Sequence, residues 1–296
     1  MFAIIAENIN VMSKKIGAAM KAREKKPIQE LAEKLAANGA THLDINLGPA
    51  RKRGDELMDW VVRTVHEAVD LPLYLDTSNV EAIEAGLKAH KASAGKPVIN
   101  SISARPERME ALLPIAKKYN AGFVALALGE EGIPRDANER GSNVAMLMAQ
   151  AMEHEIPPED IWIDPIIVPV SSQQQQVMSC TEFIAMLPEI APGYRHTCGL
   201  SNVSNGSPDK VRPILNQCYL MMLKKHGFSG AILDGLDTEI LDIARGKFAD
   251  LEKIVSDTMD GNEPDRSKLS DREADFVKTT KMLAGQSLYS DSWLEL

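Results

Sequence analysis

Short apolar runs recur along the chain, and most of them end abruptly in an acidic or amide residue, as in Leu73-Tyr74-Leu75-Asp76. The runs are aliphatic or β-branched and only a few residues long, which is typical of buried parallel strands. They predict strands at residues 2–6, 42–46, 73–76, 98–100, 122–128, 161–164, 197–200 and 231–233.

A stretch with helical spacing of apolar residues follows each predicted strand. Between residues 27 and 39, Ile28, Leu31 and Leu35 keep roughly helical spacing and Gly39 ends the helix. Further helices are predicted at 55–69, 80–88, after 106, and at 143–154, 180–187, 212–226 and 237–246. Strand–helix units that repeat every ~30 residues predict an α/β fold, a (β/α)8 TIM barrel. No G-x-G-x-x-G or phosphate loop follows a strand, which argues against an open doubly wound sheet.

Residues after about 247 exceed what eight units need. We therefore expect one barrel domain over residues 1–296, with a C-terminal excursion near 250–284. Residues 257–271 are polar and rich in Asp, Gly and Pro, which predicts a surface loop. The segment 287–293 is apolar again and is expected to dock on the barrel.

Composition narrows the possible functions. A net charge of −9 argues against nucleic acid as a partner, and no apolar run is long enough to span a membrane. Three cysteines without C-x-x-C spacing favour a reducing compartment, and the strand-like residues 2–6 do not resemble a signal peptide. We expect a cytoplasmic protein.

Polar residues stand after every predicted strand except the fifth. A single one could simply cap the next helix, but the whole set is hard to explain by capping. Because the carboxyl ends of barrel strands meet at the active-site face, the set predicts a ring of acceptors and donors there. Its members are Glu7, Asn10, Asp44, Asn46, Asp76, Asn79, Asn100, Ser103, Asp164, Ser201, Asn202, Ser204 and Asp234.

The ring carries no pattern of a metal site, and its members do not form a Ser-His-Asp or Cys-His arrangement. We expect no bound metal and no covalent acyl chemistry. Carboxylates and amides suit a flat, nitrogen-rich heterocycle such as a pterin, because a carboxylate can accept two hydrogen bonds side by side from its amino-pyrimidine edge.

Several motifs resemble the methyltetrahydrofolate–corrinoid protein methyltransferases. This family shares a pterin-binding TIM barrel with dihydropteroate synthase and with the folate domain of cobalamin-dependent methionine synthase. The matching stretches run in barrel order from the first strand to the C-terminus: 6–10, 43–49, 75–79 with 81–88, 99–101, 132–138, 163–165, 199–204, 212–216 and 289–292.

The resemblance implies a role for each matching residue. Asp164 would hold the amino-pyrimidine edge of the pterin, with Asp76 and Asn100 on its far side. Asn202 would contact N5, the nitrogen that carries the methyl group, while Arg212 and Gln174 would line the pocket mouth. The expected substrate-binding residues are Glu7, Asn46, Asp76, Asn100, Asp164, Gln174, Gly199, Ser201, Asn202 and Arg212, and the expected catalytic residues are Asn202, Asp76 and Asp44.

The implied activity is methyl transfer between N5 of tetrahydrofolate and the cobalt of a corrinoid, in either direction. Tetrahydrofolate or methyltetrahydrofolate would be the substrate, a separate corrinoid protein the partner, and the enzyme a homodimer. The methyl group could originate from O-demethylation or from methylamine-type compounds. Two alternatives stay open: a dihydropteroate synthase, and a non-catalytic folate-binding subunit.

Overall fold

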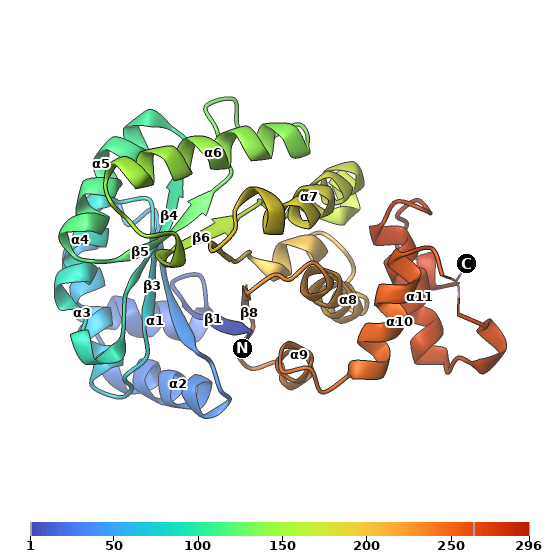
Figure 1. Ribbon diagram of the computed structural model, residues 1–296. Helices are drawn as coiled ribbons and strands as arrows, with labels where there is room; N and C mark the ends of the chain where they lie inside the picture. The colour runs from blue at the N-terminus through green and yellow to red at the C-terminus, as the bar shows by residue number, and fades with distance from the viewer. Residues whose placement is uncertain (1, 263, 296) are drawn as a thin grey trace.

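Parallel strands form one sheet in the order β7-β6-β5-β4-β3-β2-β1-β8 in the computed structural model, which describes residues 2–262 and 264–295 (Figure 1). Strands adjacent in the chain are adjacent in the sheet, and β8 returns to pair with β1. This confirms the predicted (β/α)8 barrel. The strands are β1 (Ala3–Asn10), β2 (His42–Gly48), β3 (Leu73–Thr77), β4 (Val98–Ser103), β5 (Gly122–Leu126), β6 (Ile161–Asp164), β7 (Arg195–His196) and β8 (Gly230–Leu233).

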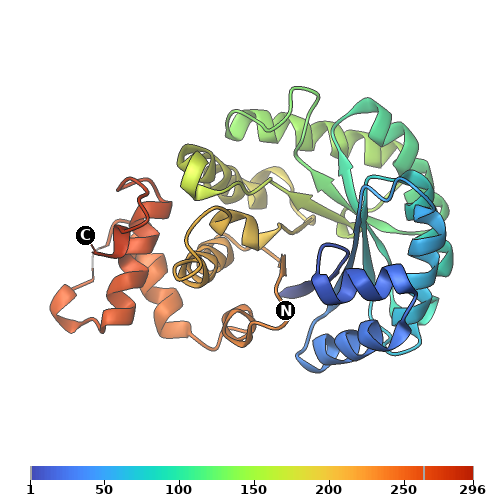
Figure 2. The ribbon, with the colours of Figure 1, turned by 180° about the vertical axis from the view of Figure 1, so that it is seen from behind.

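Helices surround the strands (Figures 1 and 2). They are α1 (Lys14–Ala22), α2 (Lys25–Ala37), α3 (Gly54–His66), α4 (Val80–Ala89), α5 (Pro106–Lys118), α6 (Ala137–Glu153), α7 (Val170–Ile190), α8 (Arg212–Lys225), α9 (Thr238–Ala244), α10 (Ala249–Met259) and α11 (Asp271–Leu283). Short 3-10 helices are η1 (Ala92–Ala94), η2 (Pro158–Asp160), η3 (Leu200–Ser204), η4 (Arg266–Lys268) and η5 (Trp293–Glu295). No helix within residues 2–262 and 264–295 is long and apolar enough to cross a membrane.

The seventh strand differs from its prediction. Residues 197–200 were expected to be extended, but β7 ends at His196 and Leu200 already begins η3. Cys198 and Leu200 are buried in the barrel wall. Apolar residues therefore stand at these positions because of their packing, although the backbone there is not a regular strand. The backbone still closes the barrel here, since Thr197 N–H donates to Ile163 O at 3.0 Å and Ile232 N–H donates to Cys198 O at 2.8 Å.

The barrel interior is filled by a small apolar cluster from alternate positions of the strands: Ala3, Ile5, Tyr74, Val98, Val124, Trp162 and Ile232. A second, larger core lies between the sheet and its helices. Side chains alternate along a strand, so the residue two positions further on also faces inward. Ile5 is followed in this way by Glu7, Tyr74 by Asp76, and Trp162 by Asp164. The apolar cluster is therefore the floor beneath the polar residues.

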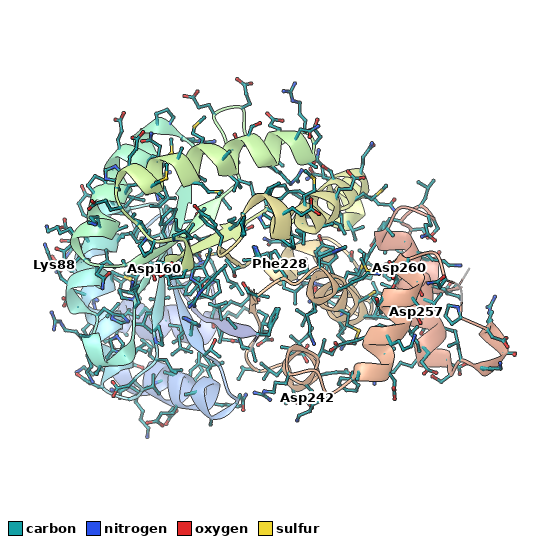
Figure 3. All side chains as sticks on the ribbon, in the orientation of Figure 1. Lys88, Asp160, Phe228, Asp242, Asp257 and Asp260 are labelled. Atoms are coloured by element: carbon teal, nitrogen blue, oxygen red, sulfur yellow. The ribbon has the colours of Figure 1, made fainter. Side chains whose placement is uncertain are left out.

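The C-terminal excursion consists mainly of α10 and α11, which pack on each other and on α8, outside the barrel (Figures 1 and 2). Asp260, labelled in Figure 3, follows the end of α10. It forms an ion pair with Lys225 of α8. Helix α11 begins with a capping box, in which the Ser270 and Glu273 side chains each bond the other's backbone N–H. Buried Trp293 then packs on α11, with its Nε1–H donating to Thr279 Oγ1 at 3.1 Å.

Tyr74 offers a test of the interior packing. Its hydroxyl is buried and has no hydrogen-bond partner in the described part of the chain. An unpaired buried hydroxyl opposes folding, so Tyr74→Phe should leave the free energy of unfolding unchanged or raise it by about 1 kcal/mol. Tyr219→Phe is the matched control: its buried hydroxyl lies 3.3 Å from Thr181 Oγ1, and its loss should cost about 1 kcal/mol. Equal losses in urea unfolding of both variants would contradict this assignment.

Candidate active site at the carboxyl end of the barrel

The ends of β2, β3 and β4 bring four predicted residues together. Strand register aligns Asn46 with Asp76, and Asp76 with Asn100. The Asn46 amide donates to the Asp76 carboxylate, and Asn100 Nδ2 donates to Asp44 Oδ1 at 3.0 Å. Asp44 lies two residues below Asn46 on β2 and is only 2% exposed. These contacts join two aspartates and two asparagines into one polar cluster.

Glu7 extends the cluster from β1. Its Oε2 lies 3.5 Å from Ser201 Oγ, at the start of η3, so the residue joins the first strand to the turn after β7. Burial raises the pKa of Glu7, and the hydrogen bond from Ser201 opposes that rise. Nearby Asp234 adds to the increase in pKa, while Arg212 acts against it.

Asp164 stands at the end of β6 and is 8% exposed. Its Oδ1 accepts a hydrogen bond from Ile166 N–H at 2.8 Å. Its second carboxylate oxygen has no hydrogen-bond partner among residues 2–262 and 264–295. A free acceptor at the top of a buried strand is therefore available to a ligand.

The aspartates of the site are buried without a cation to neutralise them. In the described chain no lysine, arginine or histidine forms an ion pair with Asp44, Asp76 or Asp164. Burial raises the pKa of Asp44 well above its usual range, with Asp76 adding to the rise, and it also raises the pKa of Asp76. Burial raises the pKa of Asp164 to about 7. A ligand that donates hydrogen bonds would stabilise the charged forms of these carboxylates.

Asn202 belongs to a different part of the site, the turn η3, where its own side chain is exposed although Leu200, Val203 and Ser204 of the same turn are buried. Its Oδ1 accepts a hydrogen bond from Asn205 Nδ2 at 3.3 Å. A Cβ atom at Gly199 would lie 2.9 Å from Asn202 Nδ2, so glycine at that position leaves room for the amide. Arg212, the first residue of α8, supports the same turn through hydrogen bonds of 3.2 Å to Ser204 Oγ and to Asn205 Oδ1.

Gln174, predicted at the pocket mouth, makes its side-chain hydrogen bonds to the C-terminal segment. Its Nε2 donates to Met282 O and Ser287 O, both at 2.7 Å, and its Oε1 accepts from Tyr289 N–H at 3.0 Å. Helix α7 begins at Val170, before the predicted residue 180, and is kinked at Gln173, so Gln174 begins the helical part after the kink rather than standing in a loop. Its side-chain amide is committed to the C-terminal segment.

Two groups of polar residues have structural roles. Asn79 accepts a hydrogen bond from Ala82 N–H and caps α4, the ordinary explanation for a polar residue after a strand.

Asn8, which we did not predict, donates to Asp234 Oδ1 at 2.6 Å and accepts from Gly235 N–H at 2.8 Å. It thereby ties the end of β1 to the loop after β8. No spacing in the sequence signals this contact between residues so far apart in the chain.

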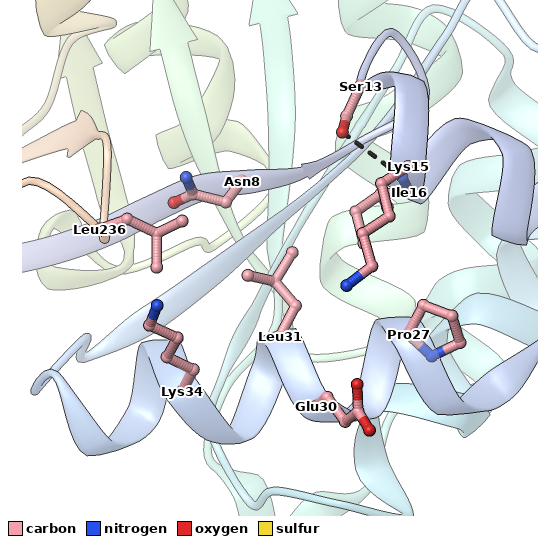
Figure 4. Close-up of a pocket in the computed structure, with 9 residues that line it drawn as sticks. All are labelled: Asn8, Ser13, Lys15, Ile16, Pro27, Glu30, Leu31, Lys34 and Leu236. Carbon is pink, nitrogen blue, oxygen red and sulfur yellow. Dashed lines mark hydrogen bonds between the residues drawn. The ribbon is translucent and has the colours of Figure 1, made fainter.

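A cavity of about 400 Å³ lies outside the barrel wall, beside β1 (Figure 4). Lys15 of α1 and Lys34 of α2 extend into it, and Leu236 borders it from the loop after β8 (Figure 4). None of the predicted substrate-binding residues lines this cavity, so it is separate from the polar cluster. Within residues 2–262 and 264–295, no three His, Cys, Asp or Glu side chains are grouped to hold a metal ion.

Comparisons with known proteins agree with the barrel fold. A family model described as "Pterin binding enzyme" matches residues 6–234. The chain is 28% identical over 241 residues to the methylcorrinoid:tetrahydrofolate methyltransferase of Eubacterium limosum, covering 80% of this chain and 87% of that protein. It is 25% identical over 241 residues to the methionine synthase of Mycobacterium tuberculosis, covering 78% of this chain but 20% of that protein.

A similar solved structure is a dihydropteroate synthase from Coxiella burnetii in complex with pteroic acid, with a TM-score of 0.61. The match covers 83% of this chain and 93% of the synthase, at 16% sequence identity. At that identity the likeness concerns the fold alone.

The buried carboxylate of Asp164 predicts how stability varies with pH. Its pKa is about 7 in the folded protein and near its ordinary value of 3.8 in the unfolded chain. Between these values the folded state keeps a proton that the unfolded state has lost, so a rise in pH favours unfolding. Asp164→Asn removes this titration. Its Tm relative to the parent should therefore increase from about pH 4 to about pH 7. Calorimetric melting curves would measure this, and a constant difference in Tm would refute it.

Proposed function

The chain belongs to the pterin-binding enzymes, since that family model matches residues 6–234, and we propose that it transfers a methyl group between a corrinoid protein and N5 of tetrahydrofolate. The observation that carries the proposal is the set of aspartates at the strand ends that have free acceptor oxygens and, among the described residues, no ion-pair partner. The similarity to a methylcorrinoid:tetrahydrofolate methyltransferase over 80% of the chain supports it.

The polar cluster suits the pterin ring of a folate. The amino-pyrimidine edge of a pterin presents two neighbouring N–H donors, which match the two oxygens of a carboxylate such as Asp164. Asn100 has an amide that can face the opposite edge of the ring, and Asp76 provides further acceptor capacity. The apolar floor of the barrel, including Tyr74 and Trp162, excludes water from beneath these groups.

The chemistry at N5 needs a proton acceptor in one direction and a proton donor in the other. When N5 of tetrahydrofolate forms a bond to the methyl carbon, its N–H proton must leave. When the methyl group departs from methyltetrahydrofolate, N5 must gain that proton. The partner's corrinoid, when bound, supplies or accepts the methyl group at its cobalt. Asp44 and Asp76, whose pKa values are raised by burial, are suited to exchange the proton through water.

Asn202 is assigned the direct contact with N5. An amide oxygen can accept a hydrogen bond from protonated N5, and this bond strengthens as positive charge develops there. The exposed position of Asn202 suits such a role, because the methyl group must pass between the folate and a separate protein.

The name of the similar methyltransferase favours transfer from corrinoid to tetrahydrofolate, and we propose this direction. Delivery of the methyl group by an O-demethylase or methylamine-type system, assembly as a homodimer, and a cytoplasmic location stay predictions. The dihydropteroate synthase alternative gains only a shared fold from the structural comparison. A non-catalytic folate-binding subunit is separated from the proposal by the second experiment below.

The first experiment tests binding. Asp164→Ala removes an acceptor from the proposed amino-pyrimidine contact and leaves the ring donors unpaired, which costs ~1–3 kcal/mol. Calorimetric affinity for tetrahydrofolate should therefore fall ~10–100-fold. Asp257→Ala, an exposed carboxylate that pairs with Lys253 on α10, is the control and should bind like the parent. Unchanged affinity in Asp164→Ala would reject this position for the pterin.

The second experiment separates binding from chemistry. A hydrogen bond made mainly in the transition state affects rate more than affinity. Asn202→Ala should bind methyltetrahydrofolate within ~10-fold of the parent but transfer its methyl group ~100-fold more slowly. Single-turnover kinetics with saturating free cob(I)alamin measures both. Asn138→Ala, an exposed asparagine on α6, controls for the substitution itself. A near-parent rate would move the catalytic role to Asp44 or Asp76. A parent protein that binds the folate but transfers no methyl group would favour the binding-subunit alternative.

A further inference from the structure

The C-terminal segment contacts Ser207, which follows the turn that carries Asn202. Tyr289 is the point of contact: its hydroxyl oxygen lies 2.9 Å from Ser207 Oγ and 2.8 Å from Asp291 Oδ1. A carboxylate only accepts, so the phenol proton goes to Asp291 and the Ser207 hydroxyl donates to the phenol oxygen. Tyr289 and Ser207 are 82 residues apart in the chain.

Tyr289 is itself held in place by two neighbours. Its backbone N–H donates to Gln174 Oε1, while Gln174 Nε2 holds the carbonyl groups of Met282 and Ser287. Its ring packs against Trp293 of η5, with 5.6 Å between the ring centroids. Trp293 is itself buried against α11. The phenol is therefore fixed from α7 on one side and from α11 on the other.

Ser207 passes this constraint to the turn. Ser207 is buried, and its N–H donates to Ser204 O at 3.1 Å. Ser204 is the last residue of η3. Ser204 Oγ donates in turn to Ser201 O at 3.1 Å, on the other side of Asn202. Asn202 thus stands in the middle of a short turn whose far end is attached to the C-terminal segment.

We propose that Tyr289 is a positioning residue for Asn202, acting through its hydrogen bond to Ser207. This inference rests on the proposed role of Asn202 at N5. Asn202 is exposed on the turn η3, and no regular strand leads directly into this turn, since β7 ends at His196. A fixed phenol at Ser207 reduces the number of conformations that the turn can adopt, and so holds the Asn202 amide in its working orientation.

The test compares Tyr289→Phe with Ser207→Ala: both remove the hydrogen bond between these two side chains, and Tyr289→Phe also removes the bond to Asp291. Each variant should slow methyl transfer from methyltetrahydrofolate to free cob(I)alamin by roughly fivefold to tenfold, as for one neutral hydrogen bond. Affinity for methyltetrahydrofolate should stay within about twofold of the parent, because the pterin contacts are elsewhere. The double variant should be no slower than Tyr289→Phe alone, since the tyrosine substitution already removes the bond to Ser207.

Tyr119→Phe is the matched control. Its hydroxyl also makes a side-chain hydrogen bond, 2.9 Å to Glu84 on the outside of the barrel, and its loss should leave the transfer rate at the parent value. Three outcomes would overturn the inference: a parent-like rate in Tyr289→Phe, multiplicative losses in the double variant, or a loss of folate affinity as large as the loss of rate. If the parent protein itself transfers no methyl group, the proposed function fails rather than the positioning role.

Discussion

Burial of carboxylates without a neighbouring cation is the constraint on which the upper half of this barrel depends. Asp44 and Asp164 lie almost entirely out of water, and this burial raises the pKa values of both carboxyl groups. No lysine or arginine in the described chain forms an ion pair with either of them. Such groups oppose folding, so their presence indicates a use other than stability. The amides of Asn46 and Asn100 relieve part of this cost by donating to the neighbouring aspartates. The remaining free oxygens then define the shape and chemistry of what can bind.

The fold and the carboxylate side of the site could be predicted from the sequence because both depend on strand periodicity. A strand of fixed direction places every second side chain inside the barrel, so Asp76, two residues after Tyr74, had to face the interior. The interaction of Asn46 with Asp76 follows from the alignment of adjacent strands. Predicting these features needs only the local sequence pattern and the rule that the carboxyl ends of parallel barrel strands meet at one face.

The rest of the site depends on contacts that have no local pattern. Gln174 was expected at the pocket mouth, yet its side chain is committed to residues 282–289, more than a hundred positions away. Cys198 and Leu200 resembled strand residues because they are buried, although the backbone there is irregular. The partnership of Asn8 with Asp234 also arises only when the barrel closes. Burial alone does not reveal the backbone conformation. The spacing of residues along the sequence does not predict hydrogen bonds between residues that are far apart in the chain.

The short seventh strand divides the barrel wall into two mechanically unequal parts. Strands β1 to β4 pair over several residues each, so the aspartates they carry belong to a stiff lattice. Arg195 and His196 are the whole of β7, and beyond them the wall continues through the hydrogen bond from Ile232 to Cys198. A strand with so few backbone hydrogen bonds to its neighbours needs less free energy to separate from the sheet than a longer strand does. The barrel wall beside Asn202 can therefore change conformation while strands β1 to β4 hold their aspartates in place.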